Sequence, residues 1–244
     1  MPRPLLDRQV SLLEYLTSGA AIFGHGDASL KPAPHGIDRG LLHLVARFSH
    51  DKRMEKIVAI FPKTFELLGG DADAVARGFA DTCPSVDTSR IENARQFYDF
   101  LAAGQRDEPL KPPHLQDVAA CELAFADARV LGGDRDLKAD KARIRPRGWI
   151  RRDCGVVLLR CSHDIRPIFE EVSGGTAATQ RDTPLAISFP RGAEHAKVFQ
   201  VAPVVFDMLA AIGDWTDPAT LGVPPELKEL IRDLAQCGLI EAPS

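Results

Sequence analysis

The sequence predicts an α+β protein in which an all-helical domain precedes a small winged-helix-like domain with a three-stranded sheet and three helices. In the N-terminal half, apolar residues recur at helical spacing between Gly and Pro breaks. In the C-terminal half, short apolar segments at 155–161, 184–189 and 196–201 predict three strands. Helical spacing returns at residue 204. Three strands followed by a helix, a short helical turn and a final helix are typical of a winged-helix-like module.

Length and composition suit two small domains in a 244-residue chain. We expect a helical domain at 1–131, a basic linker at 132–153 and the winged-helix-like domain at 154–244. A formal net charge of −4 gives no general reason to expect nucleic acid or an anionic membrane as a partner. No apolar run approaches the ~20 residues that span a bilayer. The N-terminus also lacks the apolar segment of a signal peptide, so we expect a cytoplasmic protein.

The helices expected in the first domain are separated by recognisable breaks. Phe61-Pro62 and Gly69-Gly70 are two such breaks, and Ser89 stands three residues before Glu92, the spacing of a capping box. The apolar spacing predicts helices over 5–16, 41–48, 54–60, 63–68, 74–80, 89–101 and 115–131.

Two groups of polar residues were weighed as chemical sites. His25, Asp27 and His35 could ligate a metal, but the Gly and Pro residues around them more simply mark turns. Cys161 to Asp164 places a thiol, an imidazole and a carboxylate close together, yet neighbours along a chain rarely converge on one substrate, so a strand end is favoured. The five cysteines are widely spread and predict reduced thiols. We therefore expect no metal, cofactor or catalytic residue in this chain.

The segment between the domains is basic. Residues 134–152 contain eight Lys or Arg against three Asp. These charges could hold an acidic peptide or an acidic groove of a partner protein, or they could simply keep a linker solvated. Trp149 is expected to anchor the segment against one domain.

The second domain contains a strand pair with clear alternation. Leu185, Ile187 and Phe189 lie on one face of the first strand and Ala186 and Ser188 on the other, which predicts a half-buried strand. A turn-rich break separates this strand from 196–201, so the pair is expected to form a hairpin. The final helix follows a Pro pair, and its apolar face is formed by Leu227, Leu230, Ile231 and Leu234.

The order of elements in this second domain resembles the precursor-recognition element, a module that binds leader peptides during the biosynthesis of ribosomally made, modified peptides. The residues that carry the resemblance are Val198, 204–214 and 227–240. The resemblance rests on apolar spacing and covers about a quarter of the chain.

The helical half carries a more specific resemblance. The segments that follow the family pattern in order are 60–71, 76–80 with Pro84, 97–101 and 115–124. They are similar to the helical domain of the partner proteins of multinuclear non-haem iron-dependent oxidative enzymes. Within that family, residues 11–16 and the chain length are most similar to the partner subunits of methanobactin biosynthesis. The resemblance implies a non-catalytic subunit, with iron held by a partner oxygenase that converts precursor cysteines to oxazolone and thioamide groups.

An extended leader is expected to pair with the free edge of the second hairpin strand and to lie beside the final helix. Which face of that strand is buried stays open, and the four leucine and isoleucine residues of the helix could all serve the core instead. The residues expected to bind the leader are Lys197, Val198, Phe199, Gln200, Val201, Leu227, Lys228, Leu230, Ile231, Arg232 and Leu234. The residues expected to contact the enzyme are Phe61, Pro62, Phe65, Glu122, Phe125, Arg145, Arg147 and Trp149.

Two other function classes were compared with this one. A winged-helix nucleic-acid-binding protein needs a basic recognition helix, but residues 226–236 contain three acidic residues against Lys228 and Arg232. An enzyme in its own right would show a glycine cradle, a metal-ligand spacing or a nucleophile motif, and none stands out. A peptide-binding subunit requires none of these.

Overall fold

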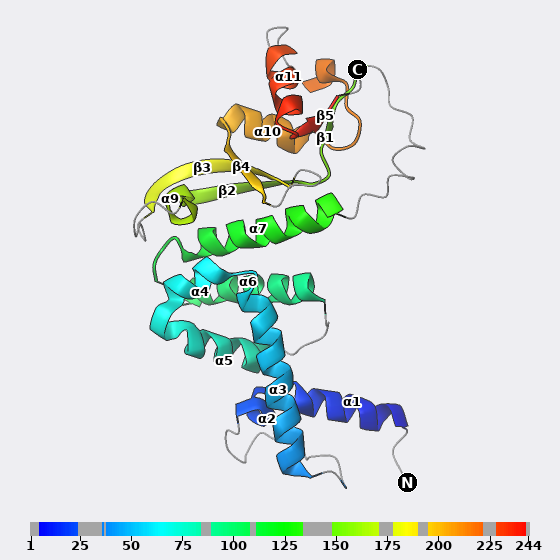
Figure 1. Cartoon of the computed structure of the whole chain (residues 1–244), viewed down its shortest axis with the longest axis vertical. Coiled ribbons are helices and arrows are strands. Elements are labelled where there is room, and N and C mark those ends of the chain that lie inside the picture. Colours follow the sequence, from blue (N-terminus) through cyan, green and yellow to red (C-terminus); the bar gives the residue numbers. More distant parts are fainter. Residues whose placement is uncertain are drawn as a thin grey trace. The chain divides into compact units, whose positions relative to one another are not determined.

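The computed structural model describes residues 5–23, 36, 38–83, 89–107, 111–133, 148–170, 178–189, 195–221 and 228–242. The protein combines helices with an antiparallel three-stranded sheet, as the sequence predicts (Figure 1). The chain divides into two compact units, Met1–Ala119 and Ala120–Ser244. The division falls inside helix α7, whereas the sequence analysis places the end of the helical domain at residue 131.

The described part of the first unit is helical. Its elements are α1 (Leu5–Leu16), α2 (Gly19–Phe23), α3 (Arg39–Val58), α4 (Pro62–Leu68), the 3-10 turn η1 (Gly69–Asp71), α5 (Ala72–Thr82), α6 (Arg90–Asp107) and the first turn of α7 (Leu115–Gly133). One expectation was wrong: the two helices predicted at 41–48 and 54–60 are the single helix α3. No Gly or Pro interrupts the segment between them, and the buried residues His50 and Arg53 continue the face begun by Leu42 and Ala46.

Aromatic rings fill one core of the first unit. Phe97 is fully buried and meets Phe61, Phe65 and Phe79 at ring-centroid distances of 5.4, 5.3 and 5.3 Å. Since Phe65, Phe79 and Phe97 come from α4, α5 and α6 and Phe61 directly precedes α4, the cluster fixes three helices against one another. A second apolar cluster, which includes Tyr15, joins α1 and α2 to α3 and α5.

The second unit contains the sheet and the last helices, and their order confirms the sequence analysis. The strands β2 (Val156–Asp164), β3 (Thr179–Ser188) and β4 (Lys197–Gln200) form an antiparallel sheet in the order β2-β3-β4. Helix α10 (Pro203–Ala211), the 3-10 turn η2 (Pro218–Leu221) and α11 (Lys228–Gln236) follow. The short α9 (Arg166–Phe169) lies between β2 and β3, and a small ribbon pairs β1 (Arg151–Arg152) with β5 (Ile240–Glu241).

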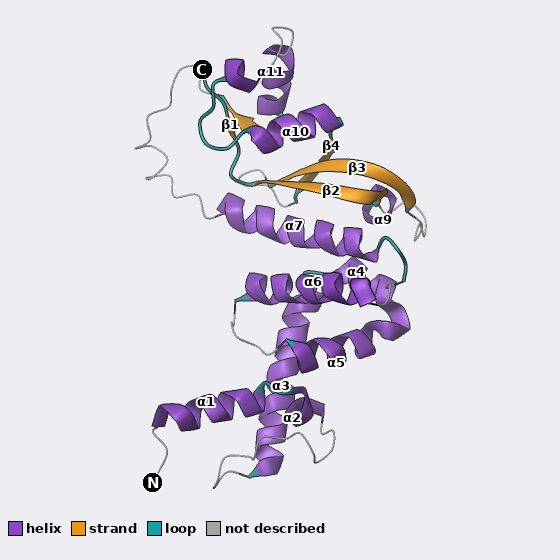
Figure 2. Ribbon diagram, turned by 180° about the vertical axis from the view of Figure 1, so that it is seen from behind, coloured by secondary structure: helices purple, strands orange, loops and turns teal. Residues whose placement is uncertain are grey.

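Residues 183–188 of strand β3 are buried on both faces, whereas its first four residues are exposed, so the prediction of a half-buried strand over 184–189 was wrong. Leu185, Ala186 and Ile187 are each fully buried. The central position of β3 explains this, because α7 covers one face of the sheet and α10 the other (Figure 2). The approach of α7 is close: a Cβ atom added to Gly132 would lie 2.9 Å from the Phe189 carbonyl oxygen.

Among the described helices, none is both long and apolar enough to cross a membrane.

Candidate functional site

Strand β4 is an edge strand with exposed side chains. It pairs with β3 on one side, and in the described sheet no further strand follows it. Lys197, Val198 and Gln200 are exposed, while Phe199 is half-buried. An edge of this kind presents backbone donors and acceptors to which another strand can pair.

The register determines which residues of β4 turn their backbone groups outward. The Val201 N–H donates to the Pro184 carbonyl oxygen at 3.1 Å, so this pair is a hydrogen-bonded one. Hydrogen-bonded pairs alternate along an antiparallel ladder, which assigns the backbone groups of Phe199 to β3. The N–H and C=O groups of Val198 and Gln200 therefore point to the outer edge.

Strand β4 and helix α11 both pack against one apolar core. Phe199 and Val201 pack against the cluster that contains Ala186 and Leu209, and Leu230 and Ile231 of α11 pack against it as well. All four packing side chains are only partly buried. Phe199 and Val201 therefore lie on the buried face of β4, and Val198 lies on the opposite face.

Only part of the apolar face predicted for α11 is buried in the core. Leu234 is 6 % exposed and belongs to the core, whereas Leu230 and Ile231 lie at its margin. Leu227 lies outside the described residues.

Exposed charged side chains of both signs lie on β4 and α11. Arg232 of α11 is exposed, and so is Lys197 of β4, but Glu229 and Asp233 are exposed on α11 too. Lys228 begins α11, and its side chain lies outside the description. The cationic pair expected at 228 and 232 stays a prediction.

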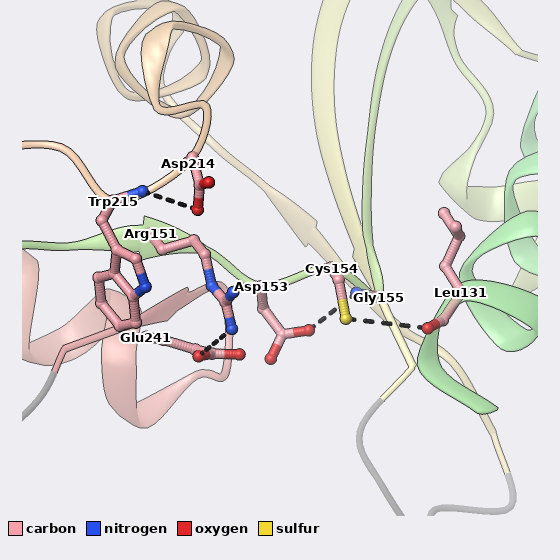
Figure 3. A network of polar contacts seen from close by, with 8 residues as sticks. All are labelled: Leu131, Arg151, Asp153, Cys154, Gly155, Asp214, Trp215 and Glu241. Atoms are coloured by element: carbon pink, nitrogen blue, oxygen red, sulfur yellow. Dashed lines mark hydrogen bonds and ion pairs between the residues drawn. The ribbon is translucent and has the colours of Figure 1, made fainter. Parts of the chain in front are cut away.

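A polar network that the sequence analysis did not predict joins β1 to β5 and to α10 in the second unit. The Arg151 guanidinium donates to the Glu241 carboxylate at 2.7 Å and lies 5.0 Å from the Trp215 ring centre (Figure 3). The Arg152 guanidinium donates to the Leu209 carbonyl oxygen of α10 at 2.9 Å. These two arginines belong to the basic segment 134–152, for which the sequence leaves open an acidic partner or a solvated linker, and in the structure they bind Glu241 of β5 and the end of α10.

The residues expected to contact an enzyme are scattered over different environments. Pro62 and Trp149 are exposed, and Phe65 and Phe125 are half-buried, the latter against Phe169 at 5.4 Å. Phe61 and Glu122 are buried within the chain. Arg145 and Arg147 lie outside the described residues. Of the described residues in this set, Phe61 and Glu122 are therefore not available at a surface.

The polar groups weighed as chemical sites are partly described. Cys161 is buried, and the Asp164 carboxylate accepts two hydrogen bonds from the Arg166 guanidinium, which lowers the pKa of Asp164. Burial raises the pKa of the Cys121 thiol far above its usual range. None of the five cysteines, all of which lie in the described part of the chain, forms a disulfide bond. No group of three or more potential metal ligands converges in the described part of the chain, and His25, Asp27 and His35 lie outside it.

Comparison with family models and with curated proteins finds no match for this chain.

Proposed function

We propose that this chain is the non-catalytic, leader-binding subunit of a complex that modifies a ribosomally made precursor peptide. Its partner would be an iron-dependent oxygenase that converts precursor cysteines to oxazolone and thioamide groups. The pathway favoured by the sequence resemblance is the biosynthesis of the copper-chelating peptide methanobactin, whose partner subunit is MbnC. Such precursors are made by ribosomes, so the cytoplasm is the proposed place of action.

The observation that carries the proposal is the free outer edge of β4, together with partly buried apolar side chains on the core of the second unit. Val198 and Gln200 offer backbone hydrogen bonds to an incoming strand. Phe199 from the strand, and Leu230 and Ile231 from α11, offer partly buried apolar side chains on the core against which the strand packs. Recognition of an extended peptide uses this combination, in which backbone pairing gives affinity and side-chain contacts give specificity.

The energies are of the right size for a peptide. Two outward residues can form up to four hydrogen bonds with an added strand, each contributing about 0.5–1.5 kcal/mol net. Micromolar affinity corresponds to about 8 kcal/mol. Burying an apolar anchor contributes about 1.5–3 kcal/mol. The leader therefore needs one or two apolar side chains that pack against the partly buried Phe199, Leu230 or Ile231.

Replacing Val198 with proline tests the edge directly. Proline removes the outward N–H and places its ring where the leader backbone would lie, but it leaves intact the hydrogen bonds from β4 to β3. We expect the variant to bind the leader at least tenfold more weakly, measured by fluorescence anisotropy with a labelled synthetic leader of a methanobactin precursor.

The matched control is Arg160→Pro on β2, the other edge strand of the sheet. The Phe189 N–H donates to the Gly155 carbonyl oxygen, and the same alternation turns the Arg160 N–H away from β3. This variant should bind the leader like the natural chain. Equal weakening of leader binding by both substitutions would contradict binding at β4. Unchanged leader binding by both variants, in chains with native circular dichroism, would contradict it as well.

A further inference from the structure

The register of β4 determines which of its side chains an added strand would meet most closely. Side chains alternate along a strand, so Lys197, Phe199 and Val201 share one face of β4, and Val198 and Gln200 share the other. An added antiparallel strand would form hydrogen-bonded pairs with Val198 and Gln200. It would then meet Lys197 and Phe199 in non-hydrogen-bonded pairs, in which the Cα atoms approach to about 4.5 Å and the side chains are closest. Lys197 and Phe199 are therefore the side chains best placed to select a peptide.

Lys197 has a charge that the sheet does not compensate. Its side chain is exposed, and the residue across from it on β3 is Ser188, which is neutral. The Ser188 hydroxyl donates to the Gly238 carbonyl oxygen at 3.4 Å. Within the part of the chain that the structure describes, no carboxylate forms an ion pair with the Lys197 ammonium. An incoming strand thus meets an uncompensated cation and, two residues further on the same face, the half-buried ring of Phe199.

The charge of β4 disfavours a second copy of this chain as the occupant of the edge. Residues 197–200 contain one lysine and no acidic residue. Two copies of β4 paired about a two-fold axis would bring two lysines into one joint sheet and supply neither with a carboxylate. A separate peptide can carry the missing negative charge.

We propose that Lys197 and Phe199 determine which leader is bound, by selecting an extended segment with an apolar residue opposite Phe199 and an Asp or Glu opposite Lys197. This inference rests on the proposed function. The two selected residues are two positions apart, because neighbours on one face of a strand have that spacing. The described three-stranded sheet is antiparallel throughout. A leader that continues the pattern runs opposite to β4, so its carboxylate follows its apolar residue by two positions.

The two contacts differ in expected size. The ion pair with Lys197 stays exposed, so removing the leader carboxylate should weaken binding only about threefold, and reversing one charge should weaken it about tenfold at 50 mM salt. Both effects should shrink at 500 mM salt, because salt screens exposed charges. Replacing the apolar leader residue with serine should weaken binding at least tenfold, since its burial beside Phe199 is lost. Backbone pairing supplies affinity, and these two side chains fix the register.

The test uses the full chain and the labelled synthetic leader of a methanobactin precursor, with binding measured by fluorescence anisotropy. Each Asp or Glu of the leader is replaced in turn by its amide and by lysine, and each apolar residue by serine. Every peptide is measured against the natural chain and against Lys197→Glu. The matched control is Lys56→Glu, at an exposed lysine of α3 in the first unit, which changes the net charge by the same amount.

We expect one leader carboxylate, two residues after an apolar residue that binding also requires, to lose its effect when Lys197 is replaced. Lys197→Glu should bind the natural leader about tenfold more weakly than the natural chain does. A leader with lysine in place of that carboxylate should bind Lys197→Glu within about twofold of the affinity between the natural partners. The control Lys56→Glu should bind the natural leader normally.

The outcomes separate this inference from the proposed function. Leader binding in which no carboxylate is coupled to Lys197 overturns the inference and leaves the proposed function standing. Coupling to a carboxylate two residues before the apolar residue overturns the antiparallel order on which the inference depends. If the natural chain binds no leader, both fail. Sedimentation of the natural chain alone also decides, because a dimer that Val198→Pro dissociates would assign the edge to a second copy and overturn the inference.

Discussion

Two buried polar side chains of α3 show how single residues are accommodated in the first unit. The Arg53 guanidinium donates to the Asn93 and Gln96 side chains and to the Cys83 carbonyl oxygen, and it lies 4.3 Å from the Phe79 ring centre. Its charge is thus met by neutral acceptors and an aromatic face. His50 instead packs edge-on against the Phe23 ring at 5.3 Å. Burial lowers the pKa of His50, an effect that nearby Asp51 opposes and Arg53 reinforces.

The lowered pKa of His50 predicts a pH dependence of stability. The unfolded chain binds the proton near the ordinary pKa of about 6.5, whereas the folded chain binds it only at lower pH. The stability is therefore present above about pH 6.5 and falls as the pH drops toward the folded-state pKa. We expect His50→Gln to lose less stability than the natural chain between pH 7.5 and 5.5 in urea unfolding. Equal losses in the two proteins would show that His50 does not titrate as inferred.

At the scale of elements, the close approach of α7 to the end of β3 depends on the absence of a side chain at Gly132. The atom that an added Cβ would meet is a backbone oxygen, which cannot turn aside as a flexible side chain would. The guanidinium of Arg129, one turn earlier, lies 5.7 Å from the Phe189 ring centre and covers the same junction.

Gly132→Ala should therefore destabilise the protein by about 1–2 kcal/mol, because overpacking outweighs the gain in helix propensity. The matched substitution is Gly104→Ala in α6, where an added Cβ has no neighbour within 4 Å. That variant should be stabilised by about 0.5–1 kcal/mol. Chemical unfolding of both proteins gives the comparison, and stabilisation of both would refute the close contact.

The sequence predicts the kind and order of most described elements because apolar periodicity reflects local geometry. It does not predict features that depend on distant neighbours. The alternation in 184–189 identifies β3, but its burial on both faces follows from where α7 and α10 lie. The break expected within α3 was wrong because charged residues between apolar stretches do not end a helix without Gly, Pro or a cap.

The same limit applies to the candidate site. Alternation places Phe199 and Val201 on one side of β4, and packing against the core that contains Ala186 and Leu209 is needed to show that this side is the buried one. The Arg151–Glu241 pair joins residues 90 positions apart in the chain, and no local pattern indicates it. Leu6 and Phe48 belong to the apolar spacing of α1 and α3 in the sequence, but their exposure is known only once the first unit is packed.

At the scale of the whole molecule, the proposed leader contact lies on β4, within the second compact unit. Under the proposed function, this unit would present the precursor peptide to a partner enzyme, and the catalytic groups would belong to that partner.

The most direct test of the central claim is hydrogen–deuterium exchange of the full chain with and without the leader peptide. Strand addition would engage the outward N–H groups of Val198 and Gln200, so exchange in β4 should slow at least tenfold when the leader saturates the chain. Exchange in β2, at the other edge, should not change. Protection confined to β2, or no protection in any strand under saturating leader, would contradict the account.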